Sequence, residues 1–256
     1  NYRIRLNTAK LMAAAPLNST DLLNATLPSD PDWQYDHQSG SADSTAFGDW
    51  YTPVNDAPVS DGKVYVVDRG VTPKGDDIGT TFFTINNFQN DTYTVAFRQQ
   101  GEAAVHELDL TIEAGKSCAY LSLDQTGAAV DVAPDDDSWD LLFTQYTHLF
   151  YIPEQTPYSV NGVLLNPINT TGAIDTVNTF DSLGLSVAQS LPYTANWDVI
   201  GYDWKFYNFD QQAYSIETDR HYVVKDVTNR YFRIRFIDFL NEVGERGYPT
   251  FEVSEL

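Results

Sequence analysis

The sequence predicts an all-β protein, built as a multi-stranded, mostly antiparallel sheet assembly with one or two short helices. Three observations lead to this prediction. Short runs that alternate apolar and polar residues recur from residue 63 to the end of the chain. The connections between them are rich in Gly, Asn and Asp, which favour turns. Aromatic residues make up 14% of the chain, and flat rings pack well on a pleated sheet.

The first sixty residues have a different composition. Residues 8–15 favour a short helix, because they contain Lys10, Leu11, Met12 and the run Ala13-Ala14-Ala15. Residues 16–62 are rich in Asn, Ser, Asp, Pro and Gly, which is typical of ordered loops. Their aromatic side chains indicate that they pack on a core. We therefore predict that residues 1–62 form an amino-terminal wrapping segment, whose alternating start continues a truncated strand.

Residues 63–256 carry the repeated strand pattern. The predicted strands cover residues 64–68, 80–86, 92–98, 105–112, 119–123, 139–146, 158–166, 199–207, 214–217, 222–226, 231–239 and 248–253. One helix is predicted over residues 180–191, where four apolar residues fall at helical spacing, although Gly184 interrupts it. We expect one β domain over 63–256, with two sub-sheets meeting near 132–138.

The strand over residues 139–146 shows the half-buried pattern most clearly. Trp139, Leu141 and Phe143 alternate with Asp140, so the three apolar side chains are expected on one face. This pattern indicates fold and carries no chemistry of its own.

The chain is strongly acidic. It has 36 Asp and Glu against 15 Lys and Arg, which gives a formal net charge of −21. Such a surface repels nucleic acid phosphates and anionic lipids, so neither is a predicted partner. No apolar run approaches the length of a membrane span, about 20 residues. The single cysteine, Cys118, lies in an apolar stretch and is expected to be a buried, inert thiol.

Four histidines are the first candidates for ligand chemistry. None of them has the spacing of a metal site, and His106 lies on an apolar strand face as a core residue would. His148 lies between aromatic residues, close to Tyr146 and Tyr151. An imidazole in such a setting can ligate a haem iron or stack on a flat ligand. His148, Tyr146 and Tyr151 are therefore the predicted ligand-binding residues.

No signature of an enzyme stands out. The nucleophile elbow, the phosphate-binding loop, the dinucleotide fingerprint and the zinc-protease motif are all missing from the sequence. Acidic pairs are interpreted as solvated loop charge, and no metal site or catalytic residue is predicted. Sequons for glycosylation occur at Asn18, Asn24, Asn90 and Asn169.

Several segments together resemble the HmuY-like family of Bacteroidetes surface lipoproteins. The resemblance is carried by residues 62–70, 139–148, 161–166, 200–205, 231–239 and 244–252, and it is strongest over Tyr231-Phe232-Arg233-Ile234-Arg235-Phe236. The order and spacing of these segments are more specific than any single motif. Coverage runs from about residue 62 to the end, as expected for a longer, divergent member.

The resemblance implies a non-enzymatic all-β protein on the outer-membrane surface or secreted. It also implies haem as the ligand, a lipid anchor upstream of this chain, and haem transfer to a TonB-dependent receptor. The best-studied members use two His ligands placed well after the Trp-Asp strand. This sequence has no His between Leu149 and Arg220, so that pair is not matched.

Three hypotheses follow. The first is a surface-exposed binding protein of this type. The second is a structural surface, matrix or filament subunit that forms homo-oligomers through β-strands. The third is a carbohydrate-binding module or hydrolase, suggested by the abundance of aromatic and acidic residues.

Overall fold

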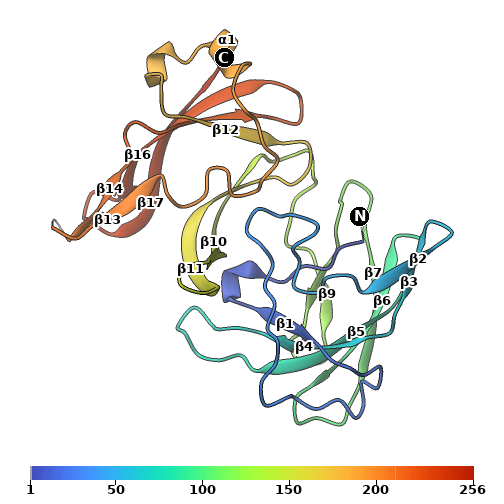
Figure 1. Cartoon of the computed structure of the whole chain (residues 1–256). Coiled ribbons are helices and arrows are strands. Elements are labelled where there is room, and N and C mark those ends of the chain that lie inside the picture. The colour runs from blue at the N-terminus through green and yellow to red at the C-terminus, as the bar shows by residue number, and fades with distance from the viewer. Residues whose placement is uncertain (1, 211) are drawn as a thin grey trace. The chain divides into compact units, whose positions relative to one another are not determined.

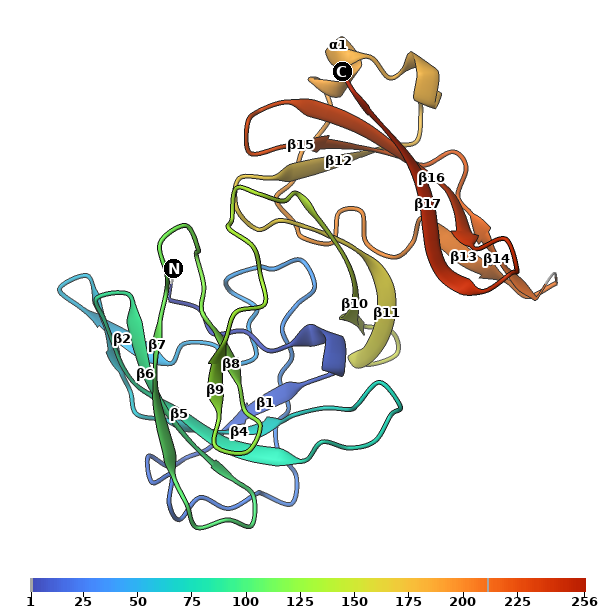
Figure 2. The ribbon, with the colours of Figure 1, turned by 180° about the vertical axis from the view of Figure 1, so that it is seen from behind.

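The computed structural model describes residues 2–210 and 212–256. The chain divides into two compact units, coloured by residue number in Figures 1 and 2. Unit 1 comprises Asn1–His37, Ser41–Asp136 and Thr147–Ser159. Unit 2 comprises Gln38–Gly40, Asp137–Tyr146 and Val160–Leu256.

Unit 1 is built on a five-stranded antiparallel sheet in the order β1-β4-β5-β6-β7 (Figure 1). The strands are β1 (Ala13–Pro16), β4 (Val64–Asp68), β5 (Thr80–Gln89), β6 (Thr92–Gln99) and β7 (His106–Thr111). Strands β5 and β6 are joined through Asn90 and Asp91, both with positive φ. Two successive left-handed residues match the twist of a tight hairpin, and Asn and Asp tolerate this conformation.

Both faces of this sheet are covered. On one face, Tyr65, Phe83 and Phe97 form a core with Trp50, and the residues around Leu121 pack against it. On the other face, Val64, Val66 and Phe82 pack with Leu22 and Trp33. Burial on both faces explains why β4 reads as a continuous apolar run and not as an alternation.

Unit 1 also contains two short hairpins. One pairs β2 (Tyr51–Val54) with β3 (Ala57–Ser60), inside the segment that sequence composition predicts to be loop. The other pairs β8 (Tyr120–Ser122) with β9 (Ala128–Val130), and Figure 2 shows it beside the five-stranded sheet.

The helix predicted over residues 8–15 is wrong for most of its length. Only η1 (Thr8–Lys10) is helical, as one turn of 3₁₀ helix, and Leu11 ends it in a left-handed conformation. The three alanines then form β1, paired with β4 and fully buried. Their small side chains fit the covered edge of the sheet, so tertiary packing outweighs the helical propensity of alanine.

Unit 2 is built on a four-stranded antiparallel sheet in the order β12-β15-β16-β17. The strands are β12 (Thr171–Asp175), β15 (His221–Lys225), β16 (Tyr231–Leu240) and β17 (Arg246–Glu255). A further hairpin pairs β13 (Lys205–Asn208) with β14 (Ala213–Ile216). Val163, Ile200 and Trp204 pack with Phe236 on one face of the sheet. Leu183 and Ala188 pack against Val223 on the other.

The helix predicted over residues 180–191 is divided in two. The structure has η2 (Phe180–Ser182) and α1 (Leu185–Ala188), separated by an extended Gly184. The apolar residues at helical spacing still pack together, because Leu183, Val187 and Leu191 belong to one cluster on the sheet. The residue that interrupts the pattern in the sequence is therefore the one that divides the helix.

The remaining strands, β10 (Leu141–Phe150) and β11 (Thr156–Leu165), pair as a hairpin. Residues of this hairpin belong to both units. The predicted all-β fold class, with antiparallel pairing and short helices, is confirmed.

Candidate functional site

The end of the β10–β11 hairpin that belongs to unit 1 carries a group of aromatic and imidazole side chains. We call it the aromatic tip, and it comprises His37, His148, Phe150, Tyr151 and Tyr158. The ring of His148 meets Phe150 edge-on at 4.8 Å, and Phe150 meets Tyr158 at 6.0 Å. Tyr151 stacks against His37 at 6.3 Å.

Strand alternation positions the first part of the aromatic tip. Thr147 and Leu149 are buried, so the side chains between and after them, His148 and Phe150, point away from that interior. Thr147 fixes this end of β10, because its hydroxyl donates to the backbone oxygen of Thr8 at 2.6 Å. The half-buried His148 and the exposed Phe150 thus share one face of a strand that is held in place.

His37 reaches the aromatic tip from a distant part of the sequence. The adjacent Asp36 is buried, and its carboxylate accepts hydrogen bonds from the backbone N–H groups of Leu6 at 2.6 Å and Ala46 at 2.8 Å. Burial raises the pKa of Asp36, while these two bonds lower it by a smaller amount. The backbone N–H of His37 donates to the backbone oxygen of Ser44 at 2.9 Å. The loop that begins at this imidazole is therefore anchored at its start and at its end.

The aromatic tip has the chemistry of a binding surface. Ile152 beside it is 91% exposed, Tyr158 is 59% exposed and Tyr151 is 54% exposed, so this part of the chain presents apolar and aromatic side chains to solvent. Imidazole nitrogen and phenol oxygen are both known ligands of haem iron, and aromatic faces stack on flat rings. The donor set therefore suits haem or another flat, largely apolar ligand.

The third predicted residue, Tyr146, lies in a different environment. It is buried in unit 2, in a cluster with Val160 and Leu164. Its hydroxyl lies beneath Gly201, where an added Cβ would be 3.4 Å from the oxygen. Burial, followed by the charge of Asp198, raises the pKa of Tyr146. The structure therefore places His148 and Tyr151 in the aromatic tip and Tyr146 in a core.

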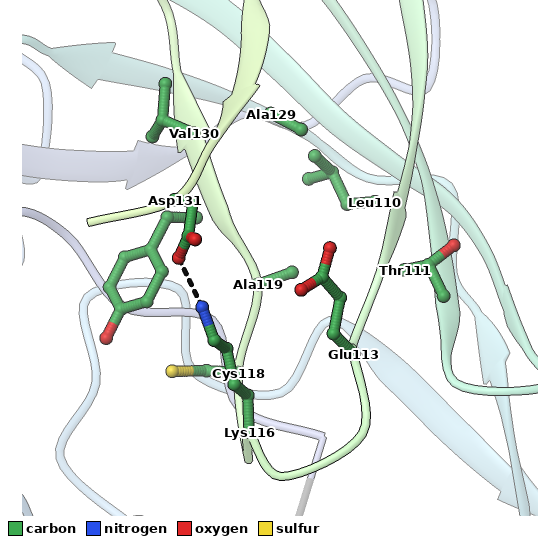
Figure 3. A pocket seen from close by; sticks show the side chains of 10 residues that line it. Leu110, Thr111, Glu113, Lys116, Cys118, Ala119, Ala129, Val130 and Asp131 are labelled. Carbon is green, nitrogen blue, oxygen red and sulfur yellow. Dashed lines mark hydrogen bonds and ion pairs between the residues drawn. The ribbon is translucent and has the colours of Figure 1, made fainter. Parts of the chain in front are cut away.

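No pattern in the sequence indicates the small cavity in unit 1. Figure 3 shows it between β7 and the β8–β9 hairpin, with apolar walls from Leu110, Ala119 and Val130. An ion pair between Lys116 and Asp131 lies at its edge. Its volume of about 160 Å³ is below the roughly 300–1,000 Å³ typical of small-molecule sites, so a porphyrin does not fit it.

Cys118 also lines this cavity, and the expectation of a buried thiol is wrong. The cysteine is exposed, because it precedes β8, a three-residue strand whose own side chains are exposed or half-buried, and it is not part of a core strand. Burial raises the pKa of the neighbouring Tyr120, and a hydrogen bond between the two side chains adds to the effect.

The four sequon asparagines, Asn18, Asn24, Asn90 and Asn169, all have exposed side chains. Asn90 lies at the β5–β6 turn, and Asn169 has a left-handed backbone. Glycosylation of these residues remains a prediction.

Across residues 2–210 and 212–256, no helix has both the length and the apolar character needed to cross a bilayer. The same residues contain no group of three or more His, Cys, Asp or Glu side chains arranged to hold a metal ion.

Comparison with known proteins relates nearly the whole chain to a protein family. The family model described as HmuY protein matches residues 1–253, which includes the amino-terminal segment outside the resemblance noted in the sequence. No curated protein and no solved structure matches the chain.

Proposed function

We propose that this chain, which belongs to the HmuY family, is a non-catalytic binding protein whose ligand site is the aromatic tip. The family is a binding-protein family, and its members are extracytoplasmic surface proteins. For this chain we further propose a location at the outer-membrane surface or in secreted form. A TonB-dependent receptor is the proposed partner, and a lipid anchor upstream of the chain is the proposed attachment.

One observation carries the proposal. The aromatic tip exposes Tyr151 and Tyr158, with Ile152 next to Tyr151 in the chain, and it includes two imidazoles on elements that are anchored to unit 1. Exposed aromatic side chains that cluster in this way stay in unfavourable contact with water unless a ligand covers them. An anchored scaffold also lowers the entropy cost of binding.

Haem is the first ligand to test, with His148 proposed as an iron ligand. Tyr151 offers a phenol oxygen, and His37 offers a second imidazole stacked on that phenol. Phe150 and Tyr158 would contact the macrocycle through their rings. This arrangement differs from a pair of His ligands after residue 149, since the first His after that position is His221.

A hemin titration tests both the ligand and the site. The wild-type chain is expected to shift the Soret band at micromolar hemin, and His148→Ala should weaken binding at least tenfold. His106→Ala is the matched control, because that imidazole contacts Phe97 on the five-stranded sheet and lies outside the aromatic tip. No Soret shift with oxidised or reduced wild type would rule out haem. An unchanged affinity in both His148→Ala and Tyr151→Ala would rule out the aromatic tip.

A structural surface, matrix or filament subunit is the second candidate function. It is favoured by the long strand β17 at the edge of the unit 2 sheet, since open edges pair with other chains. Electron microscopy of concentrated protein should then show filaments. A species that stops at a small, closed oligomer would contradict this candidate.

A further inference from the structure

Strand β17 forms the outer edge of the unit 2 sheet. It is ten residues long and pairs with β16 through Ile234↔Val253, Arg235↔Glu252 and Phe236↔Phe251. Among the described residues, no strand pairs with its other side. A long edge of this kind presents unpaired backbone groups to another chain.

The ladder shows which backbone groups of β17 point outward. The backbone N–H of Leu256 donates to the backbone oxygen of Tyr231 on β16 at 2.9 Å. The even-numbered residues of this segment therefore direct their backbone N–H and C=O groups toward β16. Because the direction alternates along an antiparallel strand, Phe251, Val253 and Glu255 direct their N–H and C=O groups outward. Pro249 is also odd-numbered, so its backbone nitrogen points away from β16. This explains why a residue without an N–H is tolerated in this strand.

The side chains near this edge are apolar, and their neighbouring charges are compensated. Val253 is 52% exposed, and Phe251 stacks on Phe143 at 5.3 Å. Glu252 accepts two hydrogen bonds from Arg235, at 2.9 and 2.6 Å. Glu255 lies 3.8 Å from Arg230. Both carboxylates of this segment therefore lie beside an arginine, and Arg230 also pairs with Asp226 at 2.9 Å.

We propose that β17 pairs antiparallel with β17 of a second copy, around a two-fold axis at Val253. An axis at Phe251 would place Val253 opposite Pro249, which lacks a donor. An axis at Glu255 would place that carboxylate opposite its own copy, and like charges directly opposite one another are destabilising.

The axis at Val253 avoids both problems. It pairs Val253 with Val253 of the second copy, and it pairs Phe251 with Glu255 in both directions. In each of these pairs the outward N–H and C=O groups exchange backbone hydrogen bonds. Glu252 then lies opposite Ser254, so no two carboxylates face each other. The result is one continuous sheet shared by two copies, and a two-fold contact of this kind closes and does not propagate.

The net charge of the chain predicts how dimerisation depends on salt. Each copy carries a formal charge of −21, so two copies repel each other over distances longer than the contact. Salt screens this repulsion with a Debye length of about 10 Å at 0.1 M. Dimerisation is therefore expected to strengthen as ionic strength rises, whereas an association held by exposed ion pairs would weaken.

Charge substitutions on the proposed axis test the inference. Val253→Lys and Val253→Glu each place two like charges opposite one another, and each should raise the dimer dissociation constant at least tenfold. An equimolar mixture of the two variants should restore the dimer, because opposite charges then meet across the axis. Val253→Thr, which keeps the backbone donor and a β-branched side chain, is the matched control and should dimerise like wild type.

Sedimentation velocity over a concentration series at low and high salt provides the measurement. Far-UV circular dichroism checks that each variant folds. If the charged variants do not fold, Val253→Pro takes their place. It removes only an outward N–H, as Pro249 does, and should give a folded monomer.

A wild type that stays monomeric at the highest concentration would overturn the proposal. Single charged variants that dimerise as well as wild type, or assemblies that grow beyond two copies, would overturn it too. Because none of these measurements uses hemin, their outcome is separate from that of the ligand-binding proposal.

Discussion

Replacing Lys205 with methionine is expected to remove a rise in stability between pH 7 and pH 9.5. Lys205 is buried in unit 2, and its ammonium lies 4.1 Å from the ring centre of Trp204 and 4.8 Å from that of Phe239. It donates to the backbone oxygens of Asn161 at 2.6 Å and Tyr202 at 3.3 Å. Burial lowers the pKa of Lys205 from 10.5 to about 8, although Asp203 opposes the shift.

The sign of the effect follows from the two pKa values. Below pH 8 the lysine is charged in both the folded and the unfolded chain, so the full cost of burying the charge is present. Between pH 8 and 10.5 the folded chain has released the proton while the unfolded chain still holds it, and stability increases with pH. With these values the lysine contributes a rise of at most about 2 kcal/mol from pH 7 to 9.5, since residual solvent screening reduces it.

Urea unfolding followed by tryptophan fluorescence measures this rise. The free energy of unfolding of wild type minus that of Lys205→Met should increase by about 1–2 kcal/mol from pH 7 to 9.5. Ionisation of unfolded tyrosines affects both proteins equally and cancels in the difference. Lys74→Met, in an exposed turn, is the matched control and should show no such change. A difference that stays constant or falls with pH would refute the assigned role of burial at Lys205.

Two further substitutions test how the amino-terminal segment is held. Arg98 donates to the carbonyls of Leu22 at 3.2 Å and Ala25 at 2.6 Å, so Arg98→Met should cost about 2–4 kcal/mol in urea unfolding and expose residues 17–33 to protease. Proteolysis at the wild-type rate would show that the segment is held without this guanidinium. Gly40→Ala would place a Cβ 2.2 Å from the Trp197 ring, whereas Gly48→Ala meets nothing within 4 Å. Both glycines have positive φ, so we expect Gly48→Ala to cost about 1 kcal/mol and Gly40→Ala at least 2 kcal/mol more, and equal thermal shifts would contradict this packing.

Local patterns predict much of the sheet structure. Strands such as β6 and β16 are recognisable because one face of each is apolar, and a period of two is a property of the strand itself. The match of a family model to residues 1–253 agrees with the resemblance read from these segments.

Other elements depend on partners that are remote in the sequence. Ala13–Pro16 is rich in alanine, which favours a helix. It forms a strand because it pairs with β4 at a covered edge of the sheet. Cys118 lies in an apolar stretch, yet it is exposed, because the adjoining β8–β9 hairpin is short and its residues are at most half-buried.

Some features of the candidate site could likewise be predicted from the sequence, and others depend on the tertiary structure. The sequence by itself determined the all-β class, the acidic surface and the group of aromatic residues around His148, because these follow from composition and from the period of two. Only the tertiary structure brought His37 against Tyr151, buried Tyr146 in a core and left β17 at an edge. Each of these depends on which distant segments meet, and local alternation holds no information about a partner strand more than one hundred residues away.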